Sequence, residues 1–266
     1  MKPKAISDMP VAALKRIRVV MTDIDDTLTL HGKLPAIAFS ALEQLQKSGF
    51  FVVPITGRPA GWCDLIARQW PVDGVVGENG AFYFKYDTRH HKMLRRYAQD
   101  EVERKNNSTK LFEIAQGVLA DFPGTAIASD QAFREIDVAI DFCEDVAPLP
   151  LSVASRIADY FTARGATAKV SSIHVNAWFG AHDKLTMALG MLTECFNMSA
   201  DDAREEVAYC GDSPNDAPMF GYFRNSIGVA NVTSFLQTIE HAPKYITVED
   251  GGPGFAAFAE LLLRSR

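Results

Sequence analysis

Short apolar runs alternate with segments of helical periodicity at the start of the chain, and this order constrains the fold most strongly. Residues 17–22 and 50–55 are rich in β-branched and aromatic side chains, which predicts buried strands. Between them, residues 35–48 have apolar side chains at helical spacing, with proline at the start and glycine just beyond the end. Another helix is expected from residue 59 to about 70, before a third strand at 73–76. Strands and helices in this order form a parallel sheet with right-handed crossovers.

The middle of the chain follows a different pattern. Residues 136–141 and 168–179 alternate between apolar and polar side chains, which predicts antiparallel strands with one exposed face. Helices are expected at residues 100–122 and 150–164. These pieces indicate a separate α+β domain, expected at residues 86–183.

Strands and helices alternate again from residue 184 to the end of the chain, with a helix expected at residues 233–241. The predicted fold class is therefore α/β. A doubly wound, Rossmann-like parallel-sheet core, made of residues 1–85 and 184–266, is interrupted once by the inserted cap domain.

Polar side chains follow several of the predicted parallel strands. In open parallel sheets, ligands bind beyond the carboxyl ends of the strands, so these side chains are expected to meet at one edge. They are Asp23, Asp25, Thr56, Asp212, Asn215 and Asp216, and Lys184, which begins the helix after the insertion, is expected to join them. Acids packed closely repel one another unless a cation lies among them, and carboxylates with few histidines nearby favour magnesium. The sequence therefore predicts a Mg²⁺ site.

Four short segments resemble the motifs of the haloacid dehalogenase superfamily. Residues 23–27 (DIDDT) resemble its first motif, residues 55–58 (ITGR) its second, Lys184 its third and residues 211–216 (GDSPND) its fourth. The insertion between the second and third motifs resembles the type-2 cap of the Cof-type branch, subfamily IIB. That branch includes sucrose-phosphatase-like and mannosyl-phosphoglycerate-phosphatase-like sugar phosphatases.

The resemblance implies a catalytic role for each of the first two acids. Asp23 would attack phosphorus in line and form an aspartyl-phosphate. Asp25 would protonate the leaving alcohol and then deprotonate the water that cleaves the intermediate. Magnesium would be held by Asp23, the backbone carbonyl of Asp25 and Asp212.

The remaining motif residues are implied to surround the phosphoryl group and the metal. Thr56, Gly57 and Lys184 would hold the transferring phosphoryl oxygens. Asn215 and Asp216 would lie around the metal's water molecules. Asp216 could also cap the helix that follows it.

Four residues on the predicted cap strands are candidates for contact with the substrate: Arg134, Asp137, His174 and Asn176. Their polar faces could cover the active site and bind a sugar. A solvated sheet face is an equally good interpretation. Glu78 and Asn79 either shape a turn or face the substrate, and the sequence leaves both questions open.

The function predicted from these motifs is magnesium-dependent hydrolysis of a small phosphomonoester, such as a sugar phosphate. One alternative is phosphomutase-like transfer to another sugar. The phosphomannomutase cap carries an arginine-rich segment, of which only a fragment appears around Arg134. Another alternative is a non-catalytic metabolite-binding protein on the same fold, although Asp23 and Asp25 are both present.

Charge and cysteine content exclude other partners and indicate a compartment. The net charge is −6 and there is no long basic run, so neither nucleic acid nor a membrane surface is an expected partner. The four cysteines are scattered, and the N-terminus lacks an apolar signal-peptide region, so we expect a cytoplasmic protein. The expected partner is a small phosphorylated metabolite, and the sequence leaves the oligomeric state open.

Overall fold

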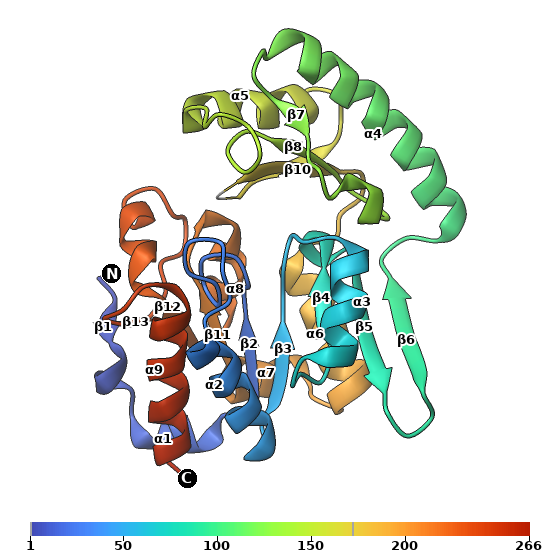
Figure 1. The fold of residues 1–266 in the computed structure, drawn as a ribbon. Helices are drawn as coiled ribbons and strands as arrows, with labels where there is room; N and C mark the ends of the chain where they lie inside the picture. The colour runs from blue at the N-terminus through green and yellow to red at the C-terminus, as the bar shows by residue number, and fades with distance from the viewer. Residues whose placement is uncertain (1, 172) are drawn as a thin grey trace.

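The computed structural model describes residues 2–171 and 173–266 of the chain. A parallel sheet of six strands, in the order β1-β13-β12-β11-β2-β3, forms the centre of the larger part of the molecule (Figure 1). Its strands are β1 (Lys4–Ala5), β2 (Val19–Thr22), β3 (Phe51–Pro54), β11 (Val207–Gly211), β12 (Asn225–Gly228) and β13 (Tyr245–Ile246). The α/β, doubly wound fold class is confirmed.

Helices cover both faces of this sheet because its strands are apolar on both sides. Along β2, Val20 packs into one core and Val19 and Met21 pack into another. The first core includes side chains from α1 (Val11–Arg16), α2 (Ala36–Lys47), α3 (Ala60–Gln69) and α9 (Gly251–Arg264). The second includes side chains from α6 (Lys184–Phe196), α7 (Ala200–Glu206) and α8 (Ala217–Tyr222).

A second, antiparallel sheet is formed by β4 (Val75–Gly77), β5 (Phe82–Asp87) and β6 (Lys92–Tyr97). One parallel bridge, from Ile55 to Val76, joins it to the end of β3. The third predicted parallel strand is therefore only bridged to the main sheet. The expected domain boundary between residues 85 and 86 falls within β5, and the hairpin continues to Tyr97 beside the core.

The inserted segment forms a third sheet of four antiparallel strands, in the order β7-β8-β10-β9. They are β7 (Ala126–Ile127), β8 (Val138–Asp141), β9 (Thr167–Val170) and β10 (His174–Trp178). The helices α4 (Glu101–Asp121) and α5 (Leu151–Thr162) cover one face, so that the sheet lies between these helices and the core (Figure 1). We call this unit the cap.

The structure differs from the sequence predictions in three places. Residues 168–179 form two antiparallel strands, β9 and β10, where one alternating stretch was predicted. The polar face of β8 and β10 is not exposed, because the core covers it: Asp141 and Asn176 are at most 3% exposed. The helix expected at residues 233–241 is replaced by a 3-10 helix, η5 (Ala230–Phe235), where β-branched Val232 and Thr233 disfavour an α-helix. Among the described residues, no helix is both long and apolar enough to cross a membrane.

Candidate active site

The loop after β2 carries the two acids of the first motif to the edge of the sheet. The amide of Asp23 donates to the carbonyl of Cys210 at 2.9 Å, so the β2–β11 ladder extends to this residue. The chain then turns around Ile24, whose carbonyl accepts from three amides, with Asp26 in the left-handed region at φ 57°. This turn leaves both Asp23 and Asp25 lining one cavity.

Lys184 is placed by the start of α6. The side chain of Asp183 caps the helix by accepting from the amide of Thr186 at 2.7 Å, which puts Lys184 at the first helical position. Its Nζ lies 2.6 Å from Asp23 Oδ1 and 3.0 Å from Asp216 Oδ1. Burial disfavours the charged lysine, but Asp216 and Asp23 outweigh this effect and raise its pKa. The structure thus brings the first, third and fourth motifs together.

Asp216 holds the loop after β11. One of its carboxylate oxygens accepts from Lys184 and from the hydroxyl of Tyr209, and the other accepts from the amides of Asp212 and Ser213 at 3.0 and 3.3 Å. A Cβ on Gly211 would come within 2.5 Å of this carboxylate, so glycine is needed there. Asp216 is fully buried, and its contacts are with the protein.

Asp212 lies in the same acidic group. The side chains of Thr27 and Asn231 donate to its two oxygens at 3.3 and 3.2 Å. Burial, together with the charges of Asp216 and Asp23, raises the pKa of Asp212 well above its usual value. Burial also raises the pKa of Asp23 to about 8, against the lowering effect of the nearby lysine.

This donor set fits a divalent cation. Three buried carboxylates meet a single lysine, and a cation held by Asp23 and Asp212 would balance the excess negative charge. Within residues 2–171 and 173–266, no group of three or more acidic, histidine or cysteine side chains is arranged to hold a metal. The predicted set is consistent with this finding, since it has two carboxylate side chains and the backbone carbonyl of Asp25.

Asn231 is a site residue that the motif search missed. Its Nδ2 also donates to the carbonyl of Asp26 at 3.0 Å, and its Oδ1 accepts from the amide of Gly251 at 3.1 Å. It therefore ties the loop after β2 to the start of α9. Asn231 follows the carboxyl end of β12, so the strand-end rule that selected the other residues could have found it.

The predicted phosphate-binding loop follows β3. Thr56 is fully buried, and its Oγ1 accepts from the amide of Arg58 at 3.0 Å, which shapes the turn. Gly57 lines the cavity, and a Cβ at this position would lie only 3.1 Å from Asn79 Nδ2. Asn215 lines the cavity from the fourth motif, and Ser213 donates to its Oδ1 at 2.7 Å.

The cap contributes the opposite wall of the cavity. Ser171, Ile173, His174 and Asn176 line this wall. The solvated-face interpretation is therefore wrong for His174 and Asn176, which are 2% and 3% exposed.

Arg134 and Asp137, by contrast, do not line the cavity. The guanidinium of Arg134 pairs with Asp130 and Asp137 at 2.9 to 3.0 Å and donates to the carbonyl of Gly57 at 2.9 Å. Asp137 also accepts from Asn176 Nδ2 at 2.9 Å. Both side chains are fully buried in these contacts, which join the cap to the loop after β3.

Glu78 resolves the question that the sequence left open. Its carboxylate accepts from the amides of Ala60, Glu135, Ile136 and Asp137 at 2.7 to 3.0 Å. Glu78 therefore fixes the cap strand entering β8 against α3. It does not line the cavity.

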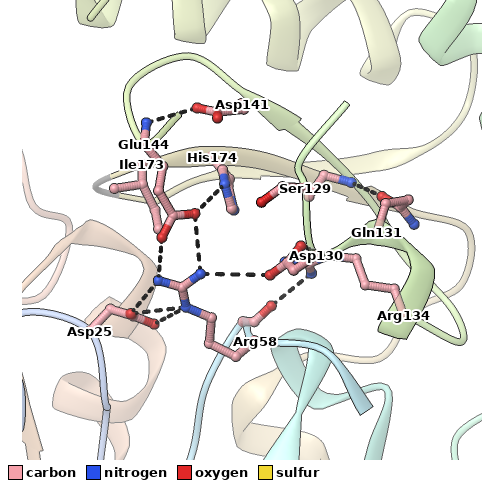
Figure 2. Close-up of polar contacts among 12 residues, drawn as sticks. Asp25, Arg58, Ser129, Asp130, Gln131, Arg134, Asp141, Glu144, Ile173 and His174 are labelled. Carbon is pink, nitrogen blue, oxygen red and sulfur yellow. Dashed lines mark hydrogen bonds and ion pairs between the residues drawn. The ribbon is translucent and has the colours of Figure 1, made fainter. Parts of the chain in front are cut away.

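A charged pair beside the cavity was not predicted from sequence. Arg58 lines the cavity from the core, and Glu144, which follows β8 in the cap, binds Arg58 (Figure 2). They are 86 residues apart and belong to no motif in common, so no local signal in the sequence connects them.

Comparison with known proteins agrees with this arrangement. The family model for haloacid dehalogenase-like hydrolases matches residues 20–117, which include the loops after β2 and β3. No match was found among curated proteins.

Several solved structures share the fold over nearly the whole chain. A Thermoplasma acidophilum protein is 19% identical, with a TM-score of 0.69, over 93% of this chain and 98% of the other. A protein described as a HAD/COF-like hydrolase from Plasmodium vivax is also 19% identical, with a TM-score of 0.69, over 97% and 100%. The sucrose-phosphatase of Synechocystis sp., solved with sucrose and phosphate, is 16% identical, with a TM-score of 0.62, over 92% and 97%. At these identities the likeness shows the fold.

Proposed function

We propose that this chain is a magnesium-dependent phosphatase acting on a small phosphomonoester, because residues 20–117 match the model for haloacid dehalogenase-like hydrolases and the chain shares the fold of a HAD/COF-like hydrolase. The carrying observation is the buried group in which Lys184 lies 2.6 Å from Asp23 and 3.0 Å from Asp216, beside Asp25 in the same cavity. A carboxylate beside a buried lysine suits nucleophilic attack on a phosphoryl group, whose negative charge needs compensation.

In the proposed reaction, Asp23 attacks phosphorus and forms an aspartyl-phosphate. Lys184, held by Asp216, stays near the transferring group and offsets its developing charge. Thr56 and Gly57, in the turn after β3, are proposed to hold phosphoryl oxygens. The Thr56 hydroxyl accepts from Arg58, which leaves its hydrogen to donate to an oxygen of the substrate.

Asp25 is the proposed acid–base group. Its side chain is 28% exposed and lines the same cavity as Asp23. It would protonate the leaving oxygen and then take a proton from the water that cleaves the aspartyl-phosphate.

Magnesium would be held by Asp23, Asp212 and the backbone carbonyl of Asp25. When bound, the metal would neutralise phosphoryl charge and orient the oxygens for in-line attack. Asn231 and Thr27 would fix the Asp212 carboxylate for this role. Asn215 and Asp216 are proposed to lie beside the metal's water molecules.

The leaving group is proposed to be a sugar or a similar polyol. The cap covers the cavity with the polar side chains of Ser171, His174 and Asn176, which suit hydroxyl groups. Because the cap covers one side of the cavity, a small metabolite is favoured over a macromolecule.

The test is a panel of phosphomonoesters assayed for release of inorganic phosphate with magnesium and with excess chelator. We expect turnover of sugar phosphates that needs magnesium, and a loss of at least about 1,000-fold in Asp23→Asn, which removes the nucleophile.

Matched measurements separate this proposal from its alternatives. Reaction in ¹⁸O-labelled water should place the label in inorganic phosphate, because water cleaves the intermediate. Transfer of phosphate to a second sugar without label would instead indicate a mutase. Wild-type activity in Asp23→Asn, or binding without turnover across the panel, would refute the proposal.

A further inference from the structure

Arg58 links the acid–base residue of the core to the cap (Figure 2). Its Nε donates to the two oxygens of Asp25 at 3.0 and 3.2 Å. Its two terminal nitrogens donate to the two oxygens of Glu144 at 2.8 and 3.2 Å. A guanidinium is planar, so two carboxylates bound at its different edges have a fixed relative orientation.

Glu144 is presented by a tight turn of the cap. The carboxylate of Asp141 accepts from the amides of Cys143, Glu144 and Asp145, each at 2.8 Å, which fixes the backbone after β8. His174 Nε2 lies 3.0 Å from Glu144 Oε2. The contacts with His174 and then Arg58 lower the pKa of Glu144 to about 2, so this carboxylate is ionised at neutral pH.

Other contacts restrict the Arg58 side chain to this place. The guanidinium lies 4.6 Å from the centroid of the Trp62 ring, and the side chain is only 10% exposed. Asp130 of the cap lies 3.6 Å away, but its carboxylate is also bound by Arg134. Arg58 therefore has one close partner in the core, Asp25, and one in the cap, Glu144.

We propose that Arg58 is a positioning residue that orients the Asp25 carboxylate when Glu144 of the closed cap holds its guanidinium. In the part of the chain that the structure describes, Arg58 is the one side chain that donates to the Asp25 carboxylate. When the cap moves away, the guanidinium loses Glu144, and only the Trp62 ring and Asp25 itself still restrict it. The acid–base group is thus held most firmly while the substrate is enclosed.

This inference rests on the proposed phosphatase function and predicts a dependence on the leaving group. An alkoxide leaving group needs a proton from Asp25, whereas p-nitrophenolate leaves without one. We expect Arg58→Met and Glu144→Gln to lower kcat for an alkyl phosphate about tenfold or more, with a much smaller loss for p-nitrophenyl phosphate. Asp145→Asn is the matched control, because this neighbouring carboxylate bonds Ser129 and not Arg58.

Two more variants test the shared contact. Arg58→Lys keeps the charge but cannot bind two carboxylates in one plane, so it should not restore the alkyl phosphate rate. The double variant, Arg58→Met with Glu144→Gln, should have an alkyl phosphate rate no lower than that of the less active single variant, because both changes remove the same contact. Melting temperatures close to that of wild type would show that the variants fold. If Arg58→Met does not fold, Glu144→Gln alone tests the proposal.

The outcomes separate the two proposals. Equal losses on both substrates, additive losses in the double variant, or full rescue by Arg58→Lys would overturn the positioning role while leaving the phosphatase function intact. A folded wild-type protein that hydrolyses no phosphomonoester of the panel would instead overturn the proposed function.

Discussion

The core and cap ends of the active-site cavity are held in different ways. At the core end, polar side chains are fixed by other residues of the core, as when Asp216 accepts from Lys184 and from the amides of Asp212 and Ser213. At the cap end, Glu144 is held by Arg58, 86 residues away in the chain and on the opposite side of the cavity. The side chains at the core end are therefore held by the sheet edge itself, whereas the contact between Glu144 and Arg58 depends on closure of the cap.

Two arginines at this junction show the same contrast. Arg134 is fully buried and pairs with Asp130 and Asp137 of its own cap, with one bond to the carbonyl of Gly57. Arg58 is the core residue that reaches across to a cap carboxylate. Arg134 attaches the cap to the loop after β3, whereas the contact of Arg58 with Glu144 depends on where the cap lies.

Replacing the lysine at the core end should have the largest effect. Lys184→Met leaves the buried carboxylates of Asp23 and Asp216 without their cation. We expect loss of phosphatase activity and a fall in the free energy of unfolding of about 3 kcal/mol or more, measured by urea denaturation. Lys47→Met, which breaks an exposed pair with Glu43, should change it by no more than about 0.5 kcal/mol. Similar changes in the two variants would contradict the buried role.

Substitutions at two core residues should raise the magnesium concentration needed for activity by different amounts. Asp212→Asn removes a proposed ligand, and Asn231→Ala removes a side chain that orients it. Loss of an orienting residue typically weakens metal binding by about 10- to 100-fold, so we expect the ligand variant to lose about 100-fold or more. Magnesium titrations of the rate measure both. Equal magnesium requirements in the two variants would argue against coordination by Asp212.

Changes at the cap wall should alter substrate binding more than chemistry. Asn176→Ala removes a cavity side chain, and loss of one hydrogen bond predicts a KM about tenfold higher for the best sugar phosphate. The kcat for p-nitrophenyl phosphate should change little. Lys169→Ala, at the paired and exposed position on β9, is the control. A loss confined to kcat would place Asn176 in the chemistry instead.

A pH dependence of folding stability is expected at the link from the cap back to α6. Burial lowers the pKa of His182 from 6.5 to about 4, with Asp183 opposing it. As the pH falls below 6.5, the unfolded chain gains a proton that the folded chain does not, so stability declines. Between about pH 7 and pH 5, wild type should lose about 2 kcal/mol more than His182→Gln. Equal losses of stability in wild type and His182→Gln, measured by urea denaturation at the two pH values, would contradict the burial of a neutral imidazole.

The sequence by itself determined the core and its chemical groups. The alternation of apolar runs and helical periodicity is local, so it predicted the parallel sheet and the helix at Lys184–Phe196. The motif residues Asp23, Lys184 and Asp212 follow strands or begin helices, and topology then brings them to one edge. Asn231 was missed because its side chain is bound by groups far away in the sequence, which no local pattern indicates.

Only the tertiary structure decided what happens between the core and the cap. Arg134 and Asn176 were both candidates for contact with the substrate, yet one is buried in ion pairs and the other lines the cavity. The contact of Arg58 with Glu144 depends on how two separately folded units pack, across 86 residues of chain. Periodicity indicates which face of an element is apolar and which is polar, but not which other element covers each face. Only the tertiary structure therefore shows that the core covers the polar face of the cap.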